Sequence, residues 1–190
     1  MIRDDSDLAA SWTAIGRELV RAPRASVHGL IPHDVAEFLS TTGMPIDAAP
    51  YISFSGLENV TVESWRRIRD RRYLVIGSDG AGDLISLDVD GGCAVQLLAH
   101  DDESAAPRFM ARSIRQLGWM LLAYAAFIQR CNAELGAGAY VDGRAPEDAM
   151  TGLRNELLEI DADGLSRESF WARDLGQFVV VRPISDKAAG

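Results

Sequence analysis

The hydrophobic positions between residues 73 and 98 fall into three short runs separated by polar turns. These runs, Tyr73–Ile76, Leu84–Val89 and Ala94–Leu98, are rich in β-branched and large apolar side chains. The intervening turns contain glycine, which adopts positive φ angles, and aspartate, which accepts hydrogen bonds from nearby backbone N–H groups. The pattern therefore predicts three consecutive antiparallel strands, a β-meander.

Apolar residues before the meander recur at helical spacing. The N-terminal segment predicts an amphipathic helix that Ser6 or Asp7 caps. A shorter helix is expected to begin at Pro32 and to stop before Gly43, with a strand at Tyr51–Phe54. The apolar face of the first helix comprises Leu8, Trp12, Ile15 and Leu19.

The longest predicted helix runs from about Arg108 to Cys131 and is apolar on nearly every side. Such a helix is buried on most sides, so we expect it to lie across the sheet beneath the C-terminal segment. Phe178–Val181 is β-like, and its place in or outside the main sheet stays open. The predicted fold class is α+β, with a central antiparallel sheet flanked by helices and a C-terminal helical extension. That extension includes a helix with Met150, Leu153, Leu157 and Ile160 on one face.

The size and charge of the chain limit its partners. Its 190 residues, 47% of them hydrophobic, suffice for a single domain with a core at about 8–131 and an extension at about 146–183. The formal net charge of −9 disfavours nucleic acid as a partner and permits an acidic surface that meets a basic protein. The basic cluster within Glu63–Arg72 is interpreted as a solvated loop or an exposed helix face rather than a nucleic-acid patch.

The chain is expected to be cytoplasmic and to have no membrane partner. Its N-terminus lacks the basic start and apolar run of a signal peptide. The apolar run from Gly118 to Ile128 is about half of what a bilayer-spanning helix needs. Cys93 and Cys131 are interpreted as buried free thiols.

The glycines of the first meander turn superficially suggest a phosphate-binding loop. Such a loop lies between a strand and a helix, whereas the segment that follows here is a strand by composition. The only lysine of the chain is Lys187, far from this turn. We therefore expect a structural turn formed by Gly77, Asp79, Gly80, Gly82 and Asp83.

No other residues form a recognisable catalytic or metal-binding motif. The aspartates at 79, 83, 88 and 90 lack the spacing of a calcium-binding loop and are interpreted as turn caps. His28, His33 and His100 have no Cys or His partner at metal-ligand spacing. Acid–base pairing of Asp101 or Asp102 with another carboxylate would rest on sequence proximity alone. The chain is therefore expected not to be an enzyme, with no catalytic residues, no cofactor and no metal site.

The order of these features resembles the SUKH superfamily, which includes the yeast cell-wall regulator Smi1/Knr4 and many bacterial immunity proteins. The resemblance covers about residues 8 to 130, and the segment to 180 with Phe170-Trp171 resembles the SUKH-4 type. The chain departs from many relatives at Ala111-Arg112-Ser113, where they carry Asn-Ser-Ser, and in its arginine cluster. The matching residues are Ile31-Pro32, Phe38-Leu39, Gly43-x-Pro45, Ile76-Gly77-x-Asp79-Gly80-x-Gly82-Asp83-Leu84-Ile85-x-Leu87-Asp88, Gly92 and Val95.

The resemblance implies an immunity protein that binds a cognate polymorphic toxin, a nuclease or a nucleic-acid deaminase, and neutralises it by stoichiometric contact. The alternative is a Smi1/Knr4-like regulatory or scaffolding module without a toxin partner. A third hypothesis is a small-molecule-binding or enzymatic domain that uses the Gly77–Asp88 turn. Neither the toxin's identity nor the oligomeric state follows from the sequence. The candidate partner-binding residues are Asp101, Asp102 and Glu103, with Asp88 and Asp90.

Overall fold

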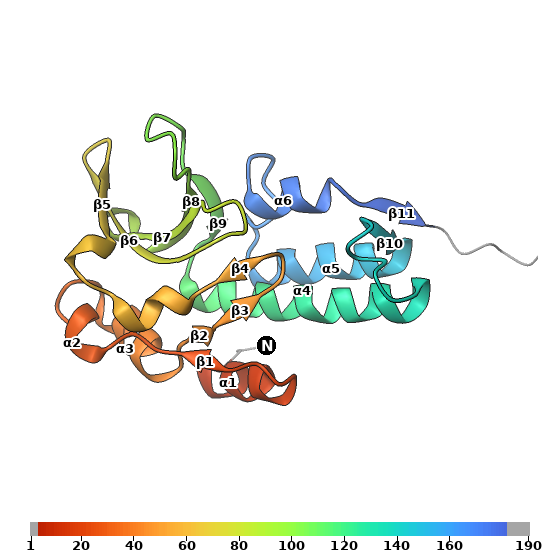
Figure 1. The fold of residues 1–190 in the computed structure, drawn as a ribbon, viewed down its shortest axis with the longest axis horizontal. Helices are drawn as coiled ribbons and strands as arrows, with labels where there is room; N and C mark the ends of the chain where they lie inside the picture. Colours follow the sequence, from red (N-terminus) through yellow and green to blue (C-terminus); the bar gives the residue numbers. More distant parts are fainter. Residues whose placement is uncertain (1–3, 182–190) are drawn as a thin grey trace, which may run out of the picture.

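The computed structural model describes residues 4–181. In it, the protein folds around an antiparallel sheet of seven strands flanked by helices (Figure 1). This arrangement is the predicted α+β class. The sheet has the order β3-β4-β6-β7-β8-β9, with β5 paired to β6 outside this path. Its strands are β3 (Asp47–Ala48), β4 (Ile52–Ser53), β5 (Trp65–Ile68), β6 (Arg71–Ser78), β7 (Leu84–Asp88), β8 (Ala94–Leu98) and β9 (Arg108–Ala111).

The central part of the sheet is the predicted meander. Strands β6, β7 and β8 pair antiparallel, and four of the five residues of β7 are buried because the strand has a neighbour on each side. The pairing of β6 with β7 shifts register between Val75 and Gly77. At Gly77, any Cβ atom would lie 2.5 Å from the carbonyl oxygen of Ser53, so β4 can approach β6 closely only because this residue is glycine.

The first helix, α1 (Asp5–Ala14), begins one turn earlier than its apolar residues suggest. Its cap is Asp4, whose carboxylate accepts a hydrogen bond from the N–H of Ser6 at 3.1 Å, so the prediction of Ser6 or Asp7 was wrong. Leu8 and Trp12 are buried as expected. The predicted helical face does not reach Leu19, because the chain turns at Gly16 (φ +75°) and then forms β1 (Leu19–Val20).

Two short helices follow β1. α2 spans Arg24–Val27 and α3 spans His33–Thr41. Pro32 is the N-cap of α3 rather than its first helical residue, since its ψ of 141° is still extended. After α3, β2 (Met44–Pro45) pairs with β1, and 3₁₀ helices occupy Ser55–Asn59, Val62–Ser64 and Val89–Gly91.

The predicted helix from Arg108 to Cys131 is two elements. Residues 108–111 form β9, which pairs antiparallel with β8 at the edge of the sheet. Ser113 then caps α4 (Ile114–Leu135) by accepting a hydrogen bond from the N–H of Gln116 at 3.2 Å. The helix is buried along most of its length, as expected, because α1, β8, β9 and the following helix α5 (Glu147–Ile160) all pack against it.

The C-terminal extension packs on α4 and on the edge of the sheet (Figure 1). α5 (Glu147–Ile160) runs beside α4, and α6 (Phe170–Leu175) follows it. β11 (Val179–Val181) pairs in parallel with β10 (Arg144–Pro146), which answers the open question about Phe178–Val181: these residues lie outside the main sheet.

One hydrophobic core joins the sheet, α4 and the extension. Trp171 of α6 is fully buried, and its indole N–H donates a hydrogen bond of 2.8 Å to the carbonyl of Met110 in β9. Cys93 and Cys131 are buried free thiols, as predicted, and burial raises the pKa of each to about 11. Within residues 4–181, no helix combines the length and apolarity that crossing a bilayer requires.

Candidate partner-binding surface

The turn between β6 and β7 is held by Asp79. Its carboxylate oxygen Oδ1 accepts hydrogen bonds from the N–H groups of Ala81 at 2.9 Å and Asp83 at 3.0 Å. Gly82 adopts a φ of +91°, a backbone conformation that strongly favours glycine. These contacts give the turn the structural role expected of it, and a phosphate-binding role would need the same N–H groups to be free.

Asp83 connects this turn to the loop after β8. Its Oδ1 accepts hydrogen bonds from the backbone N–H of His100 at 3.2 Å and from the ring Nδ1 of His100 at 3.0 Å. The guanidinium of Arg108 lies 3.5 Å from Oδ2. The hydrogen bond to Asp83 raises the pKa of His100, so the ring is more readily protonated. The start of the loop is thereby anchored to the sheet.

Asp88 is not a surface residue, contrary to its assignment as a partner contact. Its side chain is 4% exposed, Oδ1 accepts a hydrogen bond from the N–H of Gly91 at 2.9 Å, and Oδ2 lies 3.1 Å from the guanidinium of Arg71. The backbone of the β7–β8 turn and the arginine together cover the carboxylate. Asp88 therefore stabilises this turn and is removed from the candidate surface.

Asp90 is exposed but already paired. Its carboxylate accepts hydrogen bonds from the backbone N–H of Arg72 at 2.8 Å and from the Arg72 guanidinium at 2.7 and 3.0 Å. The hydrogen bonds from the Arg72 side chain are the main cause of a lowered pKa of Asp90. Asp90 can contact a partner only as part of this ion pair.

The arginine cluster forms a β-hairpin, so the expected solvated loop or exposed helix face was wrong. β5 pairs with β6 from Trp65 opposite Leu74 to Ile68 opposite Arg71. The two-residue turn at Arg69 and Asp70 has positive φ angles at both positions, which is the geometry of a tight hairpin turn. The hairpin carries exposed arginines at 66, 67, 69, 71 and 72.

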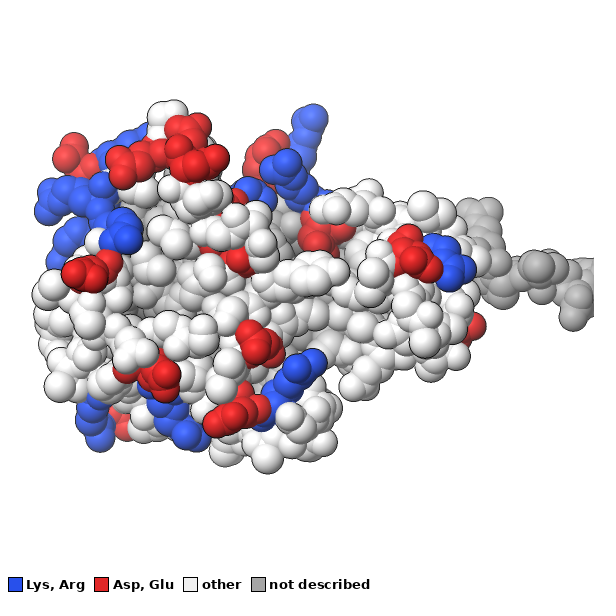
Figure 2. Space-filling model, in the orientation of Figure 1, with Lys and Arg blue, Asp and Glu red and all other residues white. Residues whose placement is uncertain are grey.

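The acidic loop predicted as a contact lies next to this hairpin. Residues Asp101, Asp102 and Glu103 are all exposed, and the Arg69 guanidinium donates a hydrogen bond to the carbonyl of Ser104 in the same loop. Asp102 Oδ1 accepts hydrogen bonds from Ser104 Oγ at 2.6 Å and N–H at 2.9 Å, which lower the pKa of Asp102. Figure 2 shows acidic and basic side chains side by side where the hairpin and the loop project.

A cavity of about 330 Å³ lies between the arginine hairpin and the segment that follows the acidic loop. Burial, followed by the negative charge of Asp88, raises the pKa of Tyr73 within it. The opposing walls come from segments far apart in the sequence, so only the fold creates this concave region. The cavity is lined by Ile68, Arg69, Arg71, Tyr73, Asp88, Gln96 and Pro107.

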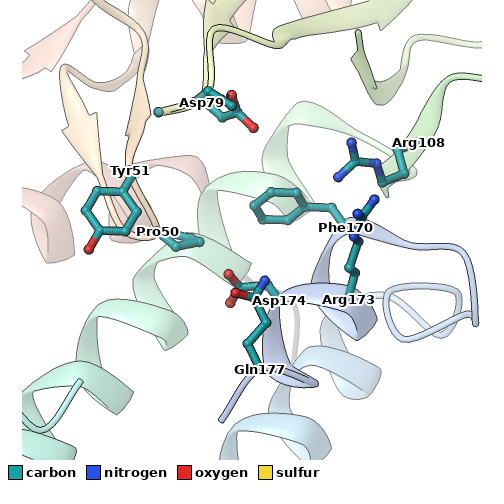
Figure 3. A pocket seen from close by; sticks show the side chains of 10 residues that line it. Pro50, Tyr51, Asp79, Arg108, Phe170, Arg173, Asp174 and Gln177 are labelled. Atoms are coloured by element: carbon teal, nitrogen blue, oxygen red, sulfur yellow. Dashed lines mark hydrogen bonds between the residues drawn. The ribbon is translucent and has the colours of Figure 1, made fainter. Parts of the chain in front are cut away.

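A second cavity, of about 350 Å³, lies between the Asp79 turn and α6 (Figure 3). Burial raises the pKa of Asp174 there, although the hydroxyl of Tyr124 donates a hydrogen bond to the carboxylate. Tyr51 is 70% exposed at the rim, an aromatic side chain suited to anchor a protein partner. The sequence did not indicate this site, because part of its lining comes from α6, which lies far from the Asp79 turn along the chain. Its other charged lining residues are Asp79, Arg108 and Arg173.

The histidines are also arranged differently from the expectation. His28 and His33 approach each other and Glu37, and the ligand atoms of all three lie within 4.8 Å of one another. The signal available in the sequence was the four-residue spacing of His33 and Glu37, which places two side chains on the same side of a helix. These are the residues with the donor types and proximity to hold a metal ion.

Comparison of the chain with protein-family models, with curated proteins and with solved structures gives no match.

Proposed function

We propose that the chain is an immunity protein that binds a cognate polymorphic toxin and neutralises it by stoichiometric contact. The observation that supports this proposal best is that the arginine hairpin and the acidic loop lie next to each other and carry opposite charges. Within residues 4–181, no hydrogen bond or ion pair engages the carboxylates of Asp101 and Glu103. They are therefore available to a partner, while the loop that carries them is held in place by Asp83 and Arg69.

The charges of this surface suit a toxin that acts on nucleic acid. Such enzymes bind phosphates with clustered lysine and arginine side chains, and carboxylates on a fixed loop can occupy the same cleft. Long-range attraction between an acidic chain and a basic cleft also speeds association. The class of toxin we propose is accordingly a nuclease or a nucleic-acid deaminase.

The arginine hairpin would determine how the two proteins are oriented. A partner that places basic groups against Asp101–Glu103 would also need acidic or neutral groups against Arg66, Arg67 and Arg69. Wrong registers would bring like charges together at a cost of several kcal/mol. A surface that carries both positive and negative charges therefore favours one docking geometry, and one cognate partner over related toxins.

The topology gives separate, weaker support to the SUKH assignment. Helices α1 and α3 precede an antiparallel meander whose first turn is capped by Asp79, and a long helix follows. This order is the one on which the resemblance rests. A shared topology is an analogy, because one fold serves many functions, so the functional proposal depends on the charged surface.

Co-expression with the toxin domain encoded beside this gene tests the proposal. We expect growth to be rescued and the two proteins to elute together as a stoichiometric complex in size-exclusion chromatography. A wild-type chain that is folded and soluble but neither rescues growth nor forms a complex would overturn the proposal. Binding to host signalling proteins, or a gene neighbourhood without toxin genes, would favour a regulatory interaction module instead.

A further inference from the structure

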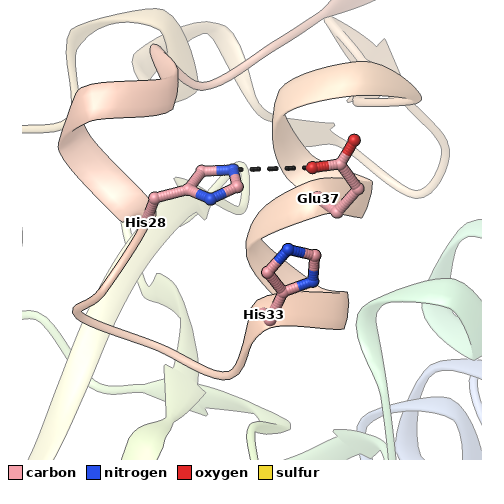
Figure 4. Close-up of side chains that lie close together, drawn as sticks. All are labelled: His28, His33 and Glu37. Atoms are coloured by element: carbon pink, nitrogen blue, oxygen red, sulfur yellow. Dashed lines mark ion pairs between the residues drawn. The ribbon is translucent and has the colours of Figure 1, made fainter.

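Two imidazole rings and a carboxylate meet where α2 turns into α3. The ligand atoms of His28, His33 and Glu37 lie within 4.8 Å of one another, and His28 Nε2 is 3.7 Å from Glu37 Oε2. The ring centroids of His28 and His33 are 5.7 Å apart, with the rings nearly perpendicular. Figure 4 shows His28 reaching from the turn toward α3, where His33 and Glu37 are carried.

The local fold explains why these groups converge. Pro32 caps α3, so His33 is its first helical residue, and Glu37 follows one turn later on the same side. His28 ends α2 in an extended conformation, and Gly29 then reverses the chain with a φ of +78°. The turn therefore returns His28 to the helix that carries the other two groups.

We propose that His28, His33 and Glu37 form a binding site for a divalent transition metal ion, with Zn²⁺ as the preferred ion. Two imidazole nitrogens and one carboxylate oxygen are a donor set typical of zinc sites that keep a further position for water or another ligand. Tetrahedral zinc with bonds of about 2.0–2.1 Å separates its ligand atoms by about 3.3 Å. The His28–Glu37 separation is already close to this value.

The side chains can make the remaining adjustment because they are partly or fully exposed. The side chains of His28 and Glu37 are 25% and 38% exposed, and His33 is exposed. Oxygen-preferring ions such as Mg²⁺ demand octahedral oxygen coordination, which this donor set lacks. The site should therefore discriminate Zn²⁺ from Mg²⁺.

Two neighbours compete with the metal for its ligand atoms. The Arg24 guanidinium donates a hydrogen bond to the Glu37 carboxylate, but this arginine is 64% exposed, so the ion pair is weak enough to be displaced. Ser40 Oγ lies 3.4 Å from His28 Nε2, the nitrogen that faces Glu37, so this contact must also give way when the metal binds. Removing Arg24 should strengthen metal binding, which a non-specific surface site would not show.

Metal binding would link the segment that joins α2 and α3 to the N-terminal part of α3. Because the three ligands lie nine residues apart at most, the ion would stabilise a local loop rather than join distant segments. It would also leave a coordination position facing solvent. The site lies outside the hairpin and loop assigned to partner binding, so it does not depend on the proposed function.

Isothermal titration calorimetry of Zn²⁺ into the full chain, expressed without a histidine tag and freed of metal, tests the site. We expect one equivalent to bind, Mg²⁺ not to bind, and His33→Ala and Glu37→Gln each to weaken Zn²⁺ binding about tenfold or more. Arg24→Gln should tighten it. His100→Ala is the matched control and should leave it unchanged, because His100 is paired with Asp83 elsewhere.

Imidazole ¹⁵N resonances give a second readout that does not depend on affinity. Zn²⁺ should shift the resonances of His28 and His33 and leave those of His100 unmoved. Circular dichroism of each variant establishes that it is folded. The proposal is overturned if the wild-type chain shows no saturable Zn²⁺ binding, or if His100→Ala weakens binding as much as His33→Ala does.

Discussion

Asp83 accepts two hydrogen bonds from His100, one from the backbone N–H at 3.2 Å and one from the ring Nδ1 at 3.0 Å. The pair connects the end of the β6–β7 turn to the start of the acidic loop, 17 residues further along the chain. The loop therefore leaves the sheet from a fixed point, which reduces the entropy that it would lose on binding a partner.

The Asp83–His100 pair should make stability depend on pH. The hydrogen bond to Asp83 raises the pKa of His100, aided by the negative charges of Asp101 and Asp79 and opposed by partial burial. A raised pKa in the folded state stabilises the protein fully below about pH 6.5, and this contribution is lost as pH rises through the folded-state pKa.

His100→Gln, which keeps a neutral donor, should therefore lower Tm more at about pH 5.5 than at about pH 8. Thermal unfolding followed by circular dichroism at the two pH values measures the difference. Equal losses of Tm at both would show that the charge of His100 contributes nothing to folding.

Asp79→Ala should destabilise the protein, because it removes the acceptor for the N–H groups of Ala81 and Asp83. We expect a loss of about 1–2 kcal/mol in the free energy of unfolding, measured by urea denaturation. Asp79→Asn keeps a carbonyl acceptor and should lose less. If the two variants lose equal stability, the carboxylate does not act by capping the turn.

Asp88 and Asp90 form a matched pair that separates a structural aspartate from a surface one. Asp88→Ala leaves the N–H of Gly91 and the Arg71 guanidinium without their buried acceptor, so we expect a loss of about 2–3 kcal/mol. Asp90→Ala removes an exposed ion pair and should cost much less. Chemical denaturation of both variants compares them, and the reverse order would show that the buried carboxylate of Asp88 is not what stabilises the turn.

Trp171→Phe tests how firmly the extension is attached to the sheet. The substitution removes the indole N–H that satisfies the buried carbonyl of Met110, and it leaves a small void. We expect a loss of about 2–4 kcal/mol with a single unfolding transition. A first transition confined to the extension, with the sheet unaffected, would contradict a shared core.

The sequence predicted those elements whose signals are local. The meander was evident because each of its turns carries glycine and aspartate, and Asp79 caps its turn through atoms only two to four residues away. The fold class followed from these strands and the helical spacing around them. The buried thiols Cys93 and Cys131 were predictable for the same reason, since Cys93 lies at the start of a predicted strand and Cys131 at the end of an apolar helix.

Apart from the ends of α1 and the cap of α3, most errors arose where distant pairing decides the structure. Residues 108–111 continue the apolar pattern of α4, and only their pairing with β8 makes them a strand. The hairpin turn at Arg69 and Asp70 contains no glycine or asparagine, so it gave no turn signal. Asp88 was assigned to the surface because Arg71, which covers it, precedes it by 17 residues. The approach of His28 to α3 likewise depends on the path of the turn.

The affinity of the purified toxin domain for charge-reversed variants tests the central claim most directly. Asp101→Lys combined with Glu103→Lys should weaken binding about tenfold or more without lowering Tm, and the loss should shrink at high salt. Glu58→Lys combined with Glu159→Lys makes the same change in net charge at exposed sites elsewhere and should bind as the wild type does. Equal affinity of all three proteins, or equal weakening in both variants, would show that the acidic loop is not the contact.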